Sequence, residues 1–143
     1  MGKWLLLIYK IPREPTAHRV SVWRKLKQLG ALLLHDAVWV LPATPRTTEQ
    51  FQWLASEITE LGGEALVWIS ELTVGSQEHA LVDELSLKVD SEYEEILGAL
   101  RKKKPDLASL GRKYQQVSMQ DYFQSKLGVK VRKMLLAKGE KSQ

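Results

Sequence analysis

Basic side chains crowd the segment between Lys10 and Lys27, where the only acid is Glu14. If a helix begins at Thr16, its apolar residues take one side and its basic residues take the other side and the flank. Exposed lysine and arginine side chains neutralise phosphates, with an affinity that depends on salt and little on sequence. We therefore predict a nucleic-acid contact by Arg13, Arg24, Lys25 and Lys27. An ordinary solvated helix face is the alternative.

Charge is strongly segregated along the 143 residues, although the net charge is only +4. Residues 1–70 contain eight basic and six acidic residues, residues 71–100 one and eight, and residues 101–143 twelve and three. The acidic segment is interpreted as a solvated surface, an intramolecular clasp, or a means of aiming a positive face at a partner. The last basic segment extends the predicted nucleic-acid contact to Lys102, Lys103, Lys104, Arg112, Lys113, Arg132 and Lys133.

Arg19 differs from the other cations, because the helical wheel places it on the inward side, close to Trp23. A buried arginine requires a carboxylate or an aromatic face. Arg13, Glu14 and Arg19 are therefore predicted to form a small network where the first strand meets the helix. An internal ion pair is one interpretation. The other is an oxyanion site at Arg13 and Arg19, since guanidinium groups suit a tetrahedral dianion such as chromate.

The elements that position these residues follow from hydrophobic periodicity and turn signals. Their predicted order is strand, helix, strand, strand, helix, strand, which is the ferredoxin-like split unit of the α+β class. A central strand ends at a proline, a glycine closes the first helix, and the hairpin turns around His35 and Asp36. The segments are Lys3–Pro12, Thr16–Gly30, Leu32–Leu41, Thr47–Gly63 and Glu64–Leu72.

The domain prediction is a ferredoxin-like sandwich at residues 1–73 and a helical extension at 74–143 that packs on or beside it. The extension is a long acidic helix from Ser76, then two shorter helices broken near Gly128, with a frayed tail after Ala137. Two helices cover one face of such a sheet. The other face, to which we assign Leu5, Leu7, Trp39 and Leu41, is expected to be covered by the extension or by a second subunit.

Several stretches resemble the amino-terminal domain of ChrB, the chromate-resistance regulator family. The most specific are "PREPTAHRV", "WRKLKQLGALLLHDAVWVLP" and "LGGEA". The layout is also similar, more distantly, to the phenylacetate-degradation repressors and to the small CRISPR adaptation nuclease, both of which form dimers. The resemblance implies a DNA-binding transcriptional regulator or sensor of chromate-resistance genes. Its expected partners are double-stranded DNA, chromate, a second copy of the chain, and a separate protein supplying the second domain of the longer family members.

Catalysis is not expected. The chain has no cysteine, and it shows no glycine-rich phosphate loop, no serine nucleophile motif and no metal-ligand spacing among its three histidines. The rival enzyme is a metal-dependent nuclease of the CRISPR adaptation type, which would need a carboxylate where Tyr9 and Lys10 stand. A turn role is expected for Asp36. We predict no cofactor and no metal site, and a cytoplasmic location. A protein-interaction module without DNA binding is the third interpretation.

Overall fold

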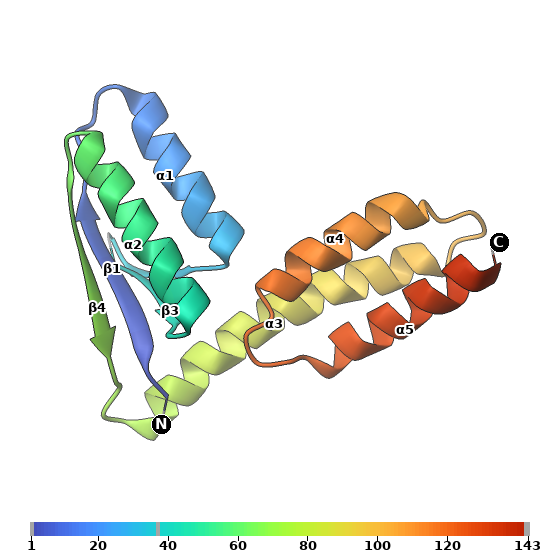
Figure 1. Cartoon of the computed structure of the whole chain (residues 1–143). Helices are drawn as coiled ribbons and strands as arrows, with labels where there is room; N and C mark the ends of the chain where they lie inside the picture. The colour runs from blue at the N-terminus through green and yellow to red at the C-terminus, as the bar shows by residue number, and fades with distance from the viewer. Residues whose placement is uncertain (1, 37, 142–143) are drawn as a thin grey trace. The chain divides into compact units, whose positions relative to one another are not determined.

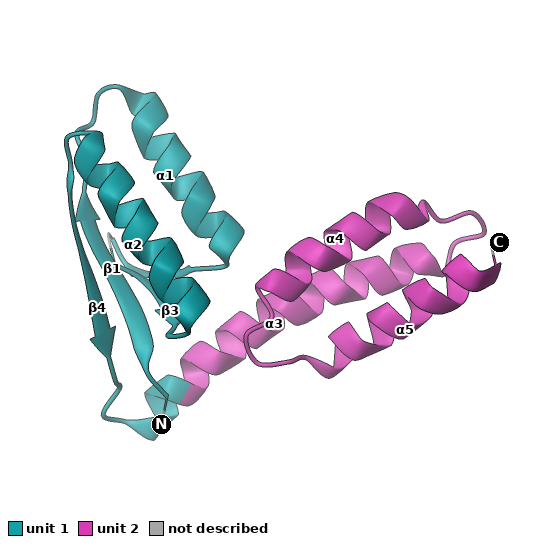
Figure 2. Cartoon of the chain, in the orientation of Figure 1, with its two compact units in different colours: residues 1–78 teal, residues 79–143 magenta. Residues whose placement is uncertain are grey.

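The computed structural model describes residues 2–36 and 38–141 (Figure 1). These residues form an α+β structure with a four-stranded antiparallel sheet and five helices. The chain divides into two compact units, residues 1–78 and 79–143 (Figure 2). The sheet and two helices make the first unit, and the second unit is helical.

The sheet has the strand order β2-β3-β1-β4, with every neighbouring pair antiparallel. The strands are β1 (Trp4–Lys10), β2 (Leu32–His35), β3 (Val38–Pro42) and β4 (Glu64–Ser70). β1 lies inside the sheet between β3 and β4, which confirms the central strand predicted from its continuous apolar run. Asp36, with a φ of 37°, lies at the end of β2, as a short polar residue can in a tight turn.

Helices α1 (Thr16–Leu29) and α2 (Pro45–Glu60) lie side by side over one face of the sheet (Figure 1). Leu5 and Leu7 of β1 share that face with Leu41 and Trp39 of β3, and all four are buried. The assignment of these four residues to the face opposite the helices is therefore wrong. Their burial comes with the unit's own helices, whose core residues are Val22, Leu26, Phe51, Leu54 and Ile58.

The opposite face is apolar too, and part of it is exposed. Ile8 of β1 and Leu66 and Trp68 of β4 are exposed there, whereas Trp4 and Val40 are buried. Trp4 is held at the start of helix α3, where its indole Nε1 donates to the Glu78 carboxylate over 3.0 Å. The expectation that the extension or a second subunit covers this face remains a prediction.

Helix ends in the first unit follow local chemistry. The predicted closing glycine, Gly30, ends α1 with a φ of 77°, and its N–H donates to the last turn of the helix. α2 begins at Pro45, two residues before the predicted segment, because Thr44 caps the helix. The Thr44 Oγ1 accepts from the Thr47 N–H over 3.0 Å, and the Thr47 Oγ1 accepts from the Thr44 N–H over 2.9 Å.

Thr47 is buried, and its hydroxyl also donates to the Pro42 carbonyl over 2.7 Å. Thr47→Val keeps the shape but removes the hydroxyl and its hydrogen bonds, so we expect the free energy of unfolding to fall by about 1 kcal/mol. Urea unfolding followed by tryptophan fluorescence measures this. Thr59→Val, which removes only an exposed hydroxyl bonded to the Ala55 carbonyl, is the matched control. Equal losses in both variants would contradict a special role for Thr47.

The second unit packs three helices around an apolar core: most of α3 (Gly75–Leu100), with α4 (Leu107–Met119) and α5 (Lys126–Lys141). Its buried residues are Val89, Tyr93, Ile96, Leu97, Leu100, Val117 and Val131. Two predictions fail here. Residues 120–125 separate α4 from α5, so the break is not near Gly128, and α5 continues to Lys141 instead of fraying after Ala137.

A polar network joins these helices around Tyr93. The Tyr93 hydroxyl donates to an Asp121 carboxylate oxygen over 3.0 Å, and the Ser125 N–H donates to the other oxygen over 2.9 Å. The Ser125 hydroxyl donates to Asp90 and accepts from the Leu127 N–H at the start of α5. Burial, and then the neighbouring Asp121 carboxylate, raise the pKa of the Tyr93 phenol. Tyr93 therefore stays a neutral donor, which fixes the segment between α4 and α5.

Candidate nucleic-acid interface

The outer surface of α1 presents the cations predicted for it. Arg24, Lys25 and Lys27 are all exposed, and Arg13 is exposed in the segment between β1 and α1. The Lys27 ammonium lies 5.5 Å from the ring centroid of Trp23, an exposed aromatic residue one turn earlier. This contact holds the lysine against the helix surface while its charge stays accessible.

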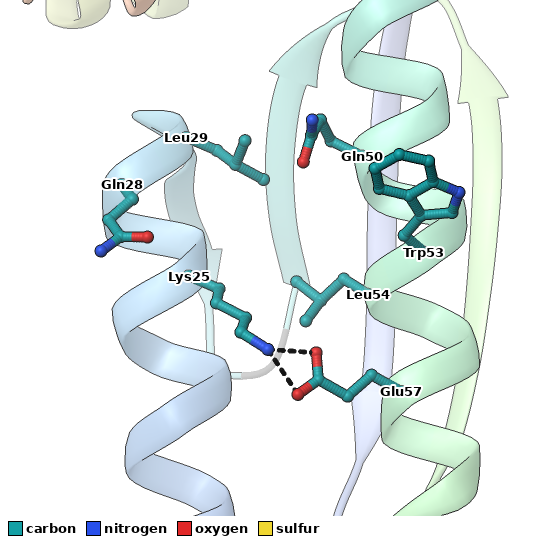
Figure 3. Close-up of a pocket in the computed structure, with 7 residues that line it drawn as sticks. All are labelled: Lys25, Gln28, Leu29, Gln50, Trp53, Leu54 and Glu57. Atoms are coloured by element: carbon teal, nitrogen blue, oxygen red, sulfur yellow. Dashed lines mark hydrogen bonds and ion pairs between the residues drawn. The ribbon is translucent and has the colours of Figure 1, made fainter. Parts of the chain in front are cut away.

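Lys25 is exposed, but its ammonium group has an acidic partner. Its Nζ lies 2.5 Å from each carboxylate oxygen of Glu57 on α2. Figure 3 shows the two side chains pointing toward each other. The pair lies at a hollow of about 300 Å³ between the two helices, which Gln28, Leu29, Gln50, Trp53 and Leu54 also line. Glu57 therefore offsets the charge of Lys25, and Arg24 is the stronger candidate for a phosphate contact.

Arg19 does not lie on the inward side of α1. It is exposed, and within the described residues no ion pair joins it to Glu14 or forms at Arg13. The predicted internal network is therefore wrong, and Lys27 rather than Arg19 contacts the Trp23 ring. Arg19 lies instead at a hollow that Trp23 and Asp36 also line. An oxyanion site at Arg13 and Arg19 stays a prediction.

The second basic group belongs to the helical unit. Lys102, Lys103 and Lys104 are exposed and consecutive in the segment between α3 and α4. Arg112 on α4, and Arg132 and Lys133 on α5, are also exposed. Across residues 2–36 and 38–141, no ion pair forms at any of these six cations.

Lys113 is the exception in this group. Its Nζ lies 2.9 Å from a Glu95 carboxylate oxygen, so basic α4 contacts acidic α3 there. This ion pair joins a basic and an acidic segment of the chain, as the intramolecular clasp considered above would. Tyr114 is partly buried and packs against the core, and its ring lies 6.1 Å from the Tyr93 ring.

Sequence reasoning missed two features of the α1–α2 surface. Glu57 is the acid that offsets Lys25, and Trp53 is 63% exposed beside it. The helical wheel contained a signal for Trp53, since the apolar stripe of α2 passes through Phe51, Leu54 and Ile58 and leaves Trp53 outside. No sequence signal joined Lys25 to Glu57, because the two residues are 32 positions apart.

The described residues contain no group of three or more histidine, cysteine, aspartate or glutamate side chains arranged to hold a metal ion. In the same part of the chain, no helix combines the length and the apolar character that crossing a membrane requires.

The chain belongs to a known class of domain. The family model described as "Protein ChrB, N-terminal" matches residues 19–119, and the chain belongs to this family. The match runs from α1 to the end of α4, so it includes parts of both units. The chain is 35% identical over 66 residues to Protein ChrB of Cupriavidus metallidurans. That alignment covers 46% of this chain and 20% of the length of the relative.

Proposed function

We propose that this protein is a cytoplasmic, homodimeric, DNA-binding regulator that controls chromate-resistance genes. Membership of the ChrB amino-terminal family supports the regulatory role. The observation that carries the DNA contact is the set of exposed cations that have no acidic partner in the described chain, with Arg24 in the first unit and Lys102 to Lys104 in the second.

We also propose that the first unit is a ferredoxin-like domain. Its element order, β1-α1-β2-β3-α2-β4, and its sheet order are those expected of that fold. In this arrangement the strands supply rigid support and α1 supplies the contact surface. Arg24 donates to phosphate oxygens in a planar fork, and Lys27 adds a point charge beside it.

Chromate is the proposed effector, with Arg13 and Arg19 as its candidate ligands. Both guanidinium groups are exposed and lie at the same end of α1, where an anion could approach from solvent. A separate protein carrying the second domain of longer family members is a further proposed partner. No described contact favours the nuclease alternative.

The direct experiment is fluorescence anisotropy of a labelled duplex from upstream of the gene, measured over a salt series with and without chromate. We expect log affinity to fall linearly with log salt, by about 0.9 for each phosphate contact. A scrambled duplex of the same length measures sequence preference. Affinity that is weak at moderate ionic strength and insensitive to salt would contradict the DNA-binding role and favour a protein-interaction module.

Glu57→Gln tests whether the α1 surface makes the contact. The substitution frees the Lys25 ammonium from its acidic partner, so we expect tighter DNA binding and a salt slope steeper by up to about 0.9. Glu60→Gln is the matched control, because it removes the same charge from an exposed site on the same helix. If both variants bind equally well, net charge alone explains the change and α1 is not the contact surface.

A further inference from the structure

Strand β4 forms one edge of the sheet, and it lacks the features that usually protect an edge. All seven of its residues pair with β1 in an unbroken register, from Lys10–Glu64 to Trp4–Ser70. The other edge, β2, is short and irregular, with four residues and a register shift between Leu33 and His35. Proteins blunt edges with lysine, proline, bulges or short length. β4 has none of these, and Glu64 at its start is its only charge.

The side chains of β4 are apolar and exposed on both faces of the sheet. Leu66 is 58% and Trp68 is 53% exposed on the open face, and Ile69 is 61% exposed on the face that carries the helices. Adjacent Ile8 continues the patch on the open face. A regular strand with a free edge and a contiguous apolar surface is typical of a docking site.

We propose that β4 pairs antiparallel with β4 of a second copy of this chain. The two-fold axis of this dimer passes midway between the two copies of Val67. The two sheets then become one continuous sheet of eight strands. The contact is isologous, because the same strand of each copy forms it. Both copies therefore pair their free edges, and the assembly closes as a dimer.

The sequence of β4 selects this register. A two-fold axis perpendicular to the sheet keeps each side chain on its own face. The axis must therefore pass midway between the two copies of one residue. With the axis at Val67, all seven residues pair: Leu66 lies opposite the partner's Trp68, Ala65 opposite the partner's Ile69, and Glu64 opposite the partner's Ser70. An axis at Leu66 would set Glu64 opposite Trp68. An axis at Trp68 would leave Glu64 unpaired and set Leu66 opposite Ser70.

Charge is compatible with this pairing. The two Glu64 carboxylates would lie at opposite ends of the strand pair, six residues and roughly 20 Å apart. That separation exceeds the Debye length of about 8 Å at physiological salt, so their repulsion is screened. No other charged residue of β4 enters the contact.

The first test is the mass of the full chain in solution, measured by sedimentation equilibrium over a concentration series. We expect a dimer that Leu66→Lys weakens by at least roughly tenfold, because the substitution replaces the apolar pair with the partner's Trp68 by a lysine, a residue that disfavours pairing at a sheet edge. Leu87→Lys, at a leucine that is 69% exposed on α3, is the matched control and should leave the dimer intact. A chain that stays monomeric, or a dimer that Leu66→Lys leaves unchanged, overturns the proposal.

The second test fixes the register, and it uses the absence of native cysteine. Val67→Cys should form an intermolecular disulfide on mild oxidation, since directly opposed residues have Cα atoms about 4.5–5.5 Å apart, within disulfide range. Ile69→Cys is more exposed and on the same face, but its partner copy would be four residues away, roughly 13 Å along the strand. Equal cross-linking of both variants would overturn the register. The proposed pairing of β4 rests on the homodimer of the proposed function. Neither test requires DNA, so a failure here is distinguishable from a failure of the DNA-binding role.

Discussion

Replacing Lys102, Lys103 and Lys104 together with alanine is expected to weaken binding to duplex DNA by roughly tenfold or more at physiological salt. The three ammonium groups are consecutive and exposed after α3, and no ion pair within the described chain neutralises them. If two of the three reach phosphates, the slope of log affinity against log salt should fall by about 1.8, since each contact contributes about 0.9. Anisotropy over a salt series measures both quantities.

The matched control replaces the same three lysines with arginine. Arginine keeps the charge and the length of the side chain, so the salt slope should stay close to that of the original protein. Arg24→Ala, made separately, reports on the first unit. A salt slope unchanged by the triple alanine variant would remove the second unit from the interface, and loss of helical signal in its circular dichroism would show that the variant had damaged the fold.

Much of the first unit follows from its sequence. The strand and helix order, the central place of β1, the turn near Asp36 and the closing glycine at Gly30 all come from patterns that act within a few residues of the chain. Short apolar runs identify the strands, and glycine at a positive φ ends a helix because it has no Cβ. The exposure of Arg24 and Lys27 follows from the same wheel that buries Val22 and Leu26.

The predictions that were wrong have a different cause, because they depend on contacts between residues far apart in the sequence. Periodicity shows that Leu5 and Leu7 share a face, but it does not show which face the helices cover. Arg19 lies at the boundary of the apolar stripe, where neighbouring elements and not the wheel decide exposure. Lys25 meets Glu57 only because α1 and α2 lie side by side.

Gly128 shows the same limit, because an isolated glycine usually signals a helix break. Here it lies inside α5, and the break occurs instead where Asp121 and Ser125 bond to Tyr93 and Asp90. A Cβ added at Gly128 would lie 2.9 Å from both Cζ and the hydroxyl oxygen of Tyr93. The glycine is therefore required by close packing of α5 on α3, a contact between residues 35 positions apart in the sequence.

We expect Gly128→Ala to lower the free energy of unfolding of the second unit by about 1–3 kcal/mol, as overpacking a well-filled core does. The new methyl group must displace the Tyr93 ring, which also strains the hydrogen bond to Asp121. All five tryptophans lie in residues 1–78, so tryptophan fluorescence follows the first unit alone, whereas circular dichroism at the helix band follows both units. The loss should appear in circular dichroism and leave the tryptophan transition in place.

Gly98→Ala is the control, because Gly98 lies in α3 and an added Cβ would meet nothing within 4 Å beyond its chain neighbours and the adjacent backbone of its own helix. There alanine should stabilise the unit by up to about 1 kcal/mol, the difference in helix propensity. Shortening the obstructing side chain in the double variant Gly128→Ala with Tyr93→Leu should make the two losses less than additive, since the leucine leaves room for the methyl group. Strict additivity, or a Gly128→Ala variant as stable as Gly98→Ala, would show that close packing against Tyr93 does not require glycine at position 128.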